Sequence, residues 1–464
     1  MKKILAFTII CALMLSCGPA DVLSDGMVIT PKIEKPAPQK LEESKPQVLQ
    51  VQNSEVPQPI PYTLSECYRM ALIQSELIAI NVDLIKEADA HFLIALSEIL
   101  PHVSFVSTDL QEETPQDKGT TLGSQKPPKS STRAFNVTQT LFNGFKAIAA
   151  IRGSKYEKNQ RIYEKTRAEQ LLLVDVANAF YLVKETGEDL RALEKIRLAL
   201  KDRIVELRAR EKLGRSRPSE VVNAKAQLYG VEASIQVVKS QQVLARQLLE
   251  FLIGQPIMRV NDTYAFPIKL MPEEYYIMKG PDRPDVIASK FAWQLAKENI
   301  LVVDSGFLPS ADLSANYYTQ RTAFDKGTDW DVTLSIDVPI FEGTEVIGNS
   351  NAARLQADQK MQLYHRSKRK APYDIKDSFV RLVTAMQVHD SLQKAYATAK
   401  LNYHLQKRDY QRSLVSNLDV LASIQTLQDA ERNYIHALYE AKRQYWQLRV
   451  AVGQSGTESL DDPF

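Results

Sequence analysis

The residue types that most often carry out chemistry are sparse in this sequence, and their spacing does not favour catalysis. The six histidines include no His-Glu-x-x-His motif, and the three cysteines do not combine with them into a zinc-binding pattern. No glycine-rich phosphate-binding loop is present, and the nine methionines are dispersed rather than grouped as copper ligands. The histidines are His91, His102, His365, His389, His404 and His436. We therefore expect no enzyme activity, no metal and no cofactor.

One cysteine stands where covalent modification is expected. Lys2 and Lys3 precede the uncharged run ILAFTIICALMLS, and Cys17 follows it. A basic start, an apolar stretch of this length and small residues at its end are typical of a secretory signal peptide. The segment MLSC resembles the lipobox of bacterial lipoproteins, although Met14 replaces the usual leucine. We expect residues 1–16 to be removed and Cys17 to be lipidated; the alternative is a plain signal peptide that is cut elsewhere.

The composition of the chain after the signal peptide limits the possible partners. Residues 17–61 are rich in Pro, Gln, Ser and charge, which is typical of an extended linker. The whole chain of 464 residues has a formal net charge of +2, and loss of Lys2 and Lys3 would bring it to zero. Nothing in this balance favours nucleic acid. Apart from Cys17, only Cys67 remains after cleavage, so the fold cannot depend on an internal disulfide.

A longer stretch of sequence occurs twice in the chain. TQTLFNG ends at Gly144, and DVPIFEG ends at Gly343, which is 199 residues later. The same offset pairs SEVVNAKAQL with LDVLASIQTL, LIGQ with VAVGQ, and Asp175 with Asp374, without a gap. An offset this constant indicates a tandem duplication in which each half builds the same substructure.

Both halves predict the same order of elements. The first half predicts helix from Thr63 to Leu100, strands at 102–110 and 133–142, helix from Gly144 to about Leu213, and helix over 219–253. The second half predicts helix before Pro309, strands at 311–321 and 330–341, helix from Gly343 to about Ser413, and helix over 418–452, with a kink or break at Pro372.

These patterns divide the chain into six segments. They are a signal peptide (1–16), a lipidated N-terminus and linker (17–61), a first repeat (62–255) with a β-hairpin at 102–142 and a helical tip near 214–219, an inter-repeat linker (256–281), a second repeat (282–454) with a β-hairpin at 310–341 and a tip near 413–418, and a tail (455–464).

The helices indicate an extended coiled coil. Seventy residues of helix would be about 100 Å long, far more than a compact domain usually contains. Apolar and small residues alternate at three- and four-residue steps from Val221 to Leu252, and the same register runs from Val420 to Ala451. Taken alone, these helices would favour a scaffolding protein.

The four strands favour a membrane instead. Each has roughly the nine to eleven residues that a tilted strand needs to cross a bilayer, and one kind of face is apolar. The apolar positions are Val103, Phe105, Phe135, Val137, Leu313, Leu334, Ile336 and Val338, and aromatic residues gather at the strand ends (Phe142, Phe307, Tyr317, Tyr318, Trp330 and Phe341). Because four strands cannot close on themselves and open edges are not tolerated in lipid, several copies must share one barrel.

In this combination the sequence resembles the TolC-like outer-membrane efflux proteins, over about residues 62–454. The resemblance rests on YTLSECYRMAL, LPHVSF and FLPSADLSANY, on LFNG and IFEG, and on the two segments after the helical tips. It implies an α+β membrane protein: a homotrimer in which four transmembrane strands per chain form a 12-strand barrel, continuous with a long α-helical periplasmic barrel. It also implies an exit duct in the outer-membrane lipid that works with a periplasmic adaptor (membrane fusion) protein and an inner-membrane transporter, in efflux or type I secretion.

The resemblance gives roles to particular residues. Phe142 and Gly144, and likewise Phe341 and Gly343, would form the two elbows where a strand turns into a tunnel helix. Each phenylalanine would pack the interface, and each glycine would relax the backbone.

The periplasmic gate would lie at the other end. Asp419 matches a family carboxylate that forms a ring in the entrance, Tyr410 matches a tyrosine that helps to hold it shut, and Glu220 is the first-half equivalent of Asp419. Val415 and Ala422 depart from the family's gate pattern. Asp419 could equally be a charge that faces its own helix dipole, and ordinary packing is an alternative role for Tyr410.

The tip turns would contact the adaptor. The positions involved are Gly214, Arg215, Arg217 and Ser219 in the first turn, and Ser413 and Leu414 in the second; the alternative is a pair of solvated turns. Because only the first turn has a glycine, the two tips should not open identically.

Two other classes of protein remain open: a periplasmic adaptor, against which the duplication argues, and a structural coiled-coil lipoprotein, against which the strands argue. The sequence does not define the exported substrate.

Overall fold

The computed structural model describes residues 61–111, 129–264, 266, 269–322 and 327–454, all within one unit, Pro59–Phe464. The segments 1–16, 17–60 and 455–464 therefore lie outside the described residues, together with Cys17. The elements are α2 (Leu64–Gln74), α3 (Glu76–Ser97), β1 (His102–Gln111), β2 (Lys129–Asn143), α4 (Lys146–Lys212), α5 (Pro218–Ile253), α6 (Glu273–Ile277), α7 (Pro284–Asp304), β3 (Ser310–Arg321), β4 (Trp330–Asp337), α8 (Glu345–Gln411) and α9 (Asn417–Ala451), with 3-10 turns η1 (Gly280–Asp282) and η2 (Ser305–Phe307).

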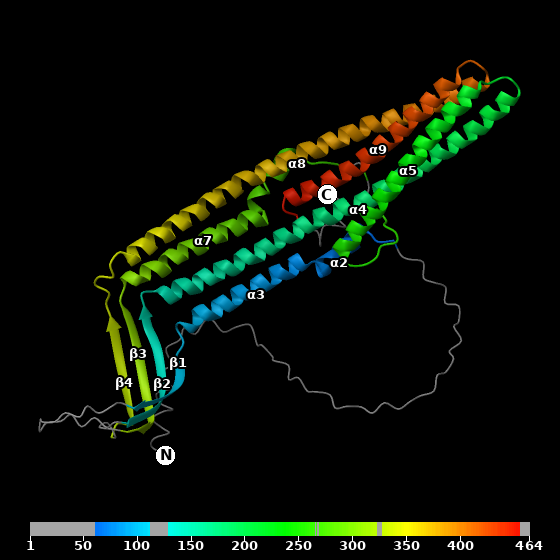
Figure 1. Cartoon of the computed structure of the whole chain (residues 1–464). Helices are drawn as coiled ribbons and strands as arrows, with labels where there is room; N and C mark the ends of the chain where they lie inside the picture. The colour runs from blue at the N-terminus through cyan, green and yellow to red at the C-terminus, as the bar shows by residue number, and fades with distance from the viewer. Residues whose placement is uncertain (1–60, 112–128, 265, 267–268, 323–326, 455–464) are drawn as a thin grey trace, which may run out of the picture. The chain divides into compact units, whose positions relative to one another are not determined.

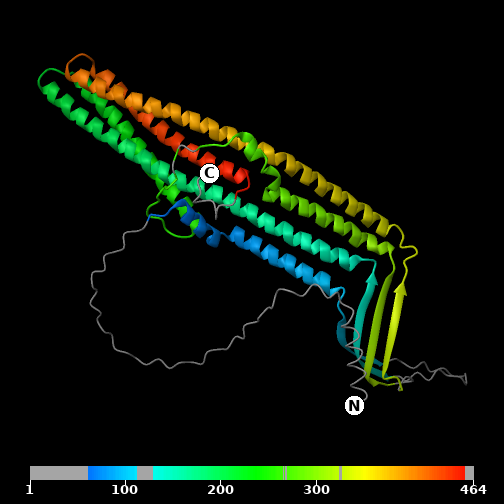
Figure 2. The same ribbon diagram turned by 180° about the vertical axis from the view of Figure 1, so that it is seen from behind.

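The expected order of elements occurs in both halves. Helix, two strands, one long helix and one shorter helix follow one another twice (Figure 1). The long helices α4 and α8 have 67 residues each, which corresponds to about 100 Å. Figures 1 and 2 show the strands at one end of these helices and the α4/α5 and α8/α9 turns together at the other end. Within the described residues, no helix is both long enough and apolar enough to cross a membrane.

The strands form one antiparallel sheet in the order β1-β2-β3-β4. Val103 lies opposite Val137, Phe105 opposite Phe135, and Leu313 opposite Leu334, so the apolar positions share one face as expected. This face is open in the single chain, where the side chains of Val103 and Ile336 are each 66% exposed.

The opposite face of the sheet is polar and internally bonded. The Asn136 amide donates to Asn316 Oδ1 over 2.8 Å, and the Asn316 amide donates to Asp331 Oδ1 over 2.8 Å. The Tyr318 hydroxyl donates to Asp331 Oδ2 over 2.7 Å. Since a slip of one residue would turn these groups toward the apolar face, the bonded row fixes the register of β2, β3 and β4.

Three predicted elements differ clearly from the structure in their bounds, and for two of them the structure shows a local reason. The helix expected from Thr63 to Leu100 is two helices, because Ser75 is extended and its hydroxyl accepts from the Ile78 amide to start α3. Strand β4 ends at Asp337 rather than at Phe341, since Pro339 has no amide to continue the ladder. Strand β2 begins earlier than expected, at Lys129. A kink or a break was expected at Pro372, and helix α8 continues through this residue without a break.

Two hydrophobic clusters hold the helices together. The first surrounds the α2 and α9 ends and contains Phe180, Tyr181 and Trp446 together with Cys67, whose thiol pKa is raised by burial to about 12. The second lies at the tips, where α4, α5, α8 and α9 meet. The predicted register supplies buried residues to both clusters, from Val221 to Leu249 in α5 and from Val420 to Leu448 in α9. The tips are therefore packed structures rather than free hairpins.

Candidate functional site

The two tip turns have the same backbone geometry despite their different sequences. Gly214 (φ +68°) and Ser413 (φ +60°) both adopt the left-handed conformation at equivalent positions of the repeat. In the first turn the Arg210 carbonyl accepts from the Arg215 amide over 2.8 Å, and in the second the Asp409 carbonyl accepts from Leu414 over 2.9 Å. A residue other than glycine is strained in this conformation by about 1–2 kcal/mol, so the second turn is the less stable of the two.

The helices that leave the turns begin differently. At α9, the Ser416 amide and hydroxyl donate to Asp419 Oδ2 over 2.9 and 2.6 Å, and the Asp419 amide donates back to Ser416 Oγ over 3.3 Å. This reciprocal pair is a capping box. The hydrogen bonds from the Ser416 side chain and backbone hold the pKa of Asp419 below its ordinary value. Asp419 is therefore ionised at neutral pH, and its carboxylate stabilises the helix start as well as facing solvent.

The first-half carboxylate is bonded within its own turn. The Ser216 hydroxyl donates to Glu220 Oε2 over 2.6 Å, and Glu220 lies in the first turn of α5. Arg215 and Arg217 are exposed, and neither forms an ion pair within the described residues. The paired tips therefore expose polar and basic side chains, including Ser219 and these two arginines, beside three apolar ones, Leu213, Leu414 and Leu418.

Tyr410 lies at the centre of a cluster that joins α4, α8 and α9. The guanidinium carbons of Arg203 and Arg210 lie 3.6 and 4.4 Å from the centre of its ring. Arg203 Nε donates to Asn417 Oδ1 over 3.0 Å, and Arg203 Nη1 donates to Glu206 over 2.8 Å. Arg203, Tyr410 and Asn417 are only 4, 6 and 3% exposed. The ring therefore anchors the end of α8 to α4 by desolvated cation–π contacts.

Sequence reasoning missed Arg203 and Asn417. Arg203 falls at a helical position whose neighbours Ile196, Leu200 and Leu207 are all core residues. A charged residue within such a stripe is a signal of a buried polar contact, and this signal was available in the sequence.

The first elbow is tightly built. Gly144 has φ +65°, and a Cβ at this position would lie 2.8 Å from the Ser305 carbonyl oxygen and 2.9 Å from Leu308 Cβ. Phe142 and Phe145 form an edge-to-face pair with ring centres 5.1 Å apart. Strand β2 thus turns into α4 over a close backbone approach that only glycine permits.

The second elbow is open in the single chain. Gly343 has the same left-handed backbone, with φ +66°, but a Cβ there would meet nothing within 4 Å. Phe341 is 86% exposed and Ile340 is 95% exposed. The two elbows therefore share a backbone conformation but not a packing environment.

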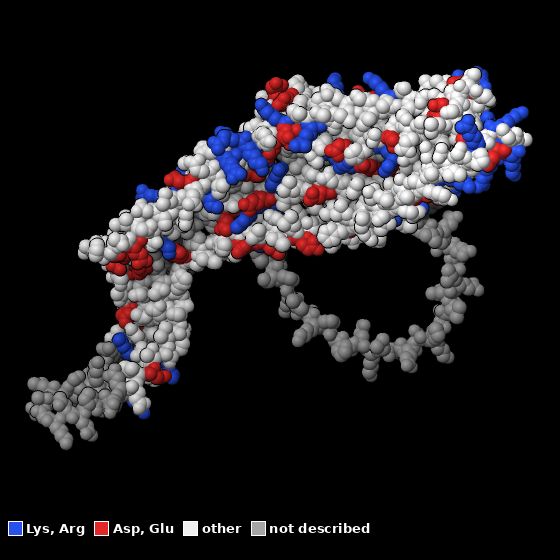
Figure 3. All heavy atoms as spheres, turned by 45° about the horizontal axis from the view of Figure 1, so that its top comes forward, with Lys and Arg blue, Asp and Glu red and all other residues white. Residues whose placement is uncertain are grey.

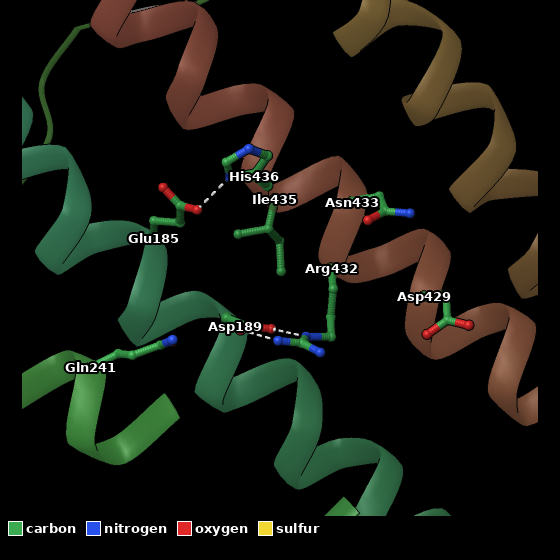
Figure 4. Close-up of a pocket in the computed structure, with 8 residues that line it drawn as sticks. All are labelled: Glu185, Asp189, Gln241, Asp429, Arg432, Asn433, Ile435 and His436. Atoms are coloured by element: carbon green, nitrogen blue, oxygen red, sulfur yellow. Dashed lines mark hydrogen bonds and ion pairs between the residues drawn. The ribbon is translucent and has the colours of Figure 1, made fainter. Parts of the chain in front are cut away.

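A polar cavity of about 320 Å³ lies between α4, α5 and α9 (Figure 4). Arg432 donates to both carboxylate oxygens of Asp189 over 2.7 and 3.0 Å, and His436 Nδ1 lies 2.7 Å from Glu185 Oε1. Glu185 also accepts from Arg443 over 2.7 Å. Four of these side chains, Glu185, Asp189, Arg432 and His436, are thus bonded across the α4–α9 contact. No group of side chains suited to a metal ion occurs among the described residues.

Comparisons with known proteins agree with this architecture. The family model described as outer membrane efflux protein matches residues 84–255 and 282–454. The outer membrane protein TolC of Vibrio cholerae is 22% identical over 358 residues, covering 73% of this chain and 81% of that protein. The crystal structure of the outer membrane protein VceC of Vibrio cholerae matches with a TM-score of 0.75 at 19% identity, covering 85% of this chain and 97% of that chain. The CmeC outer membrane channel of Campylobacter jejuni matches with a TM-score of 0.74 at 18% identity, covering 86% and 88%.

These matches define a transport protein of the outer membrane rather than an enzyme. The chain belongs to the outer membrane efflux protein family. The resemblance inferred from the sequence motifs is thereby confirmed, and the alternatives of an adaptor or a purely structural lipoprotein are set aside.

Proposed function

We propose that three copies of this chain form the exit duct of a tripartite efflux or type I secretion system. In this assembly twelve strands close into one barrel in the outer membrane, and the long helices form a tunnel through the periplasm. The duct conducts substrates passively from an inner-membrane transporter and a periplasmic adaptor to the outside.

One observation carries this proposal: the sheet is apolar on one exposed face and has two unpaired edges. Neither β1 nor β4 has a second neighbouring strand among the described residues. Unpaired backbone groups cannot remain in lipid, so the sheet must close with strands from other copies.

The helices also present faces that a neighbouring copy could cover. Large apolar side chains are exposed on α2 (Ile73), α3 (Leu77, Ile80), α5 (Val222, Tyr229, Phe251) and α8 (Leu355, Leu363, Val380). At about 25 cal/mol per Å², covering such stripes along helices of this length supplies a large part of the free energy of assembly.

The tips supply the proposed gate and docking surface. In a trimer, three copies of Asp419 would surround the entrance and favour cations, while Glu220 would form a second ring. The Arg203–Tyr410–Asn417 cluster would hold α8 and α9 against α4 in the closed state. The adaptor would bind the exposed turn residues, from Gly214 to Ser219 and around Ser413 and Leu414.

The lipid anchor at Cys17 is a separate part of the proposal. Signal cleavage before Cys17 followed by acylation, including palmitate, would attach the mature N-terminus to the membrane, and residues 17–61 would link it to α2. Mass spectrometry of the mature N-terminal peptide tests this directly: a diacylated or triacylated Cys17 is expected, and an unmodified peptide that starts elsewhere would contradict it.

Oxidative cross-linking tests the trimer. Single cysteines scanned along β1, each combined with one on β4, should form disulfides between copies and give a covalent trimer in detergent. A matched pair at Val103 and Val137, which lie opposite each other within one chain, should cross-link without raising the mass. Absence of any intermolecular β1–β4 product from folded protein would refute the shared barrel.

A further inference from the structure

A dense basic surface lies about a third of the way along α8, away from the tips and the strands. Figure 3 shows Lys and Arg side chains gathered over this part of the helix. The sequence there reads RSKRK from Arg366 to Lys370, and no Asp or Glu occurs between Asp358 and Asp374. Arg366, Lys368, Arg369 and Lys370 are all exposed and form no ion pair with a described acidic residue. Their positive charge is therefore not neutralised within the described part of the chain.

This surface contains an aromatic pair as well as charge. Trp293 of α7 and Tyr364 of α8 stack with ring centres 5.9 Å apart and an angle of 13° between the rings. Lys297 Nζ lies 5.2 Å from the Trp293 ring centre. Residues three or four apart are neighbours on a helix surface, so Lys290 and Lys297 flank Trp293, and Lys360 and Lys368 flank Tyr364. We call these six residues, together with Arg366, Arg369 and Lys370, the α7/α8 basic surface.

The duplicated scaffold does not require this surface. At the repeat offset, Lys368, Arg369 and Lys370 correspond to Glu169, Gln170 and Leu171 of α4. Gln170 is buried and donates to the Gly453 carbonyl over 2.7 Å, which is a structural contact. Because α4 forms an equally long helix without a basic run, the charge on α8 serves something outside the helix itself.

The position of the surface excludes the lipid headgroups as its partner. Lys368 lies 23 residues after Glu345, where α8 leaves the strands, and this corresponds to about 35 Å of helix. The headgroup layer beside a bilayer core is only about 5–8 Å thick, and the Debye length in physiological salt is about 8 Å. An anionic partner must therefore lie in the periplasm.

We propose that the α7/α8 basic surface binds the anionic glycan of the cell wall, peptidoglycan; this rests on the proposed periplasmic placement of the helices. Lysine ammonium groups pair with the carboxylates that the polymer carries. Trp293 and Tyr364 stack on each other and are partly exposed, so they form an apolar patch between the lysines on which the C–H groups of a sugar ring can pack, and this suits a glycan better than a simple polyanion. Single surface ion pairs are weak, but three copies per duct would act together on one polymer.

Co-sedimentation with isolated cell-wall sacculi tests this inference. The full-length protein, purified in detergent, is compared with the double variant Lys290→Glu/Lys368→Glu and with Lys394→Glu/Lys400→Glu. The control makes the same charge change at exposed positions, both of them on α8 outside the surface. We expect the first variant to bind about tenfold more weakly and the control to bind like the original protein. Sacculi whose carboxylates have been converted to amides should lose binding to all three proteins.

Two results would overturn the inference. One is the absence of sedimentation of the original protein in low salt; the other is equal binding by both double variants. Conductance of the same preparations in planar bilayers separates this test from that of the duct. Conducting protein that does not bind sacculi refutes only the surface, whereas folded protein that never conducts counts against the duct itself.

Discussion

The contact between Tyr410 and two arginines makes a quantitative prediction about the gate. If opening moves the end of α8 away from α4, the contacts of the Tyr410 ring with Arg203 and Arg210 are lost in the open state. Tyr410→Ala removes these contacts from the closed state, whereas Tyr410→Phe keeps the ring in place. The two substitutions therefore separate the role of the ring from that of the hydroxyl.

The expected magnitude follows from the burial of the cluster. Tyr410 is only 6% exposed, so each cation–π contact contributes about 1–2 kcal/mol, and the two together contribute about 2–4 kcal/mol per chain. Since about 1.4 kcal/mol is a factor of ten, Tyr410→Ala should shift each chain toward the open state by roughly 30-fold to 1,000-fold. Tyr410→Phe should change the equilibrium by less than about tenfold, because its ring still faces both guanidinium groups.

Single-channel recording in planar bilayers measures this shift as the fraction of time spent open. Tyr403→Ala is a matched control, since Tyr403 packs against the same cluster but has no described cation–π contact. We expect long openings for Tyr410→Ala, and near-original behaviour for Tyr410→Phe and Tyr403→Ala. Equal opening of Tyr410→Phe and Tyr410→Ala would show that the hydroxyl, not the ring, holds the tip, and would refute the argument.

Three further predictions concern the elbows and the turns. Gly144→Ala should lower the melting temperature clearly more than Gly343→Ala, because only the first new Cβ meets backbone atoms, at 2.8 Å; equal effects in calorimetry would contradict the packing described for the elbows. Ser413→Gly should stabilise the folded protein by up to about 1 kcal/mol in denaturant titrations by removing left-handed strain, and destabilisation would show that the serine side chain has another role. Ser416→Ala should raise the pKa of Asp419, followed by NMR. Because this pKa is lowered in the folded state, the stabilisation from the capping box is complete above the ordinary carboxyl range and is lost as pH falls through the lowered value, so an unchanged pKa would mean that the capping box does not act in solution.

Much of the fold could be predicted because it depends on periodic local patterns. The heptad register gave the buried faces of α5 and α9, and strand alternation gave the two faces of the sheet. The errors occur where one residue overrides the pattern: Ser75 caps a new helix inside an otherwise continuous one, and Pro339 stops β4 early. At Pro372 the pattern overrides the single residue instead, because α8 stays helical through the proline.

The site was less predictable, because its contacts join residues that are far apart in the chain. Tyr410 was identified by resemblance, but Arg203 precedes it by 207 residues, and only the packing of α4 against α8 brings the two together. In the same way, Trp293 and Tyr364 stack only because α7 and α8 are antiparallel neighbours. A charge facing its own helix dipole was the alternative considered for Asp419, and the structure adds the capping box with Ser416, which was not predicted.

The most direct test of the central claim is the conductance of the purified mature protein in planar bilayers, compared with Asp419→Ala. The account predicts discrete channels for a trimer, with a cation preference that weakens when the three Asp419 carboxylates are removed. Channels whose ion preference does not change in Asp419→Ala would support the duct but would show that Asp419 does not line its entrance. Folded, trimeric and inserted protein that stays silent even with Tyr410→Ala would contradict the account.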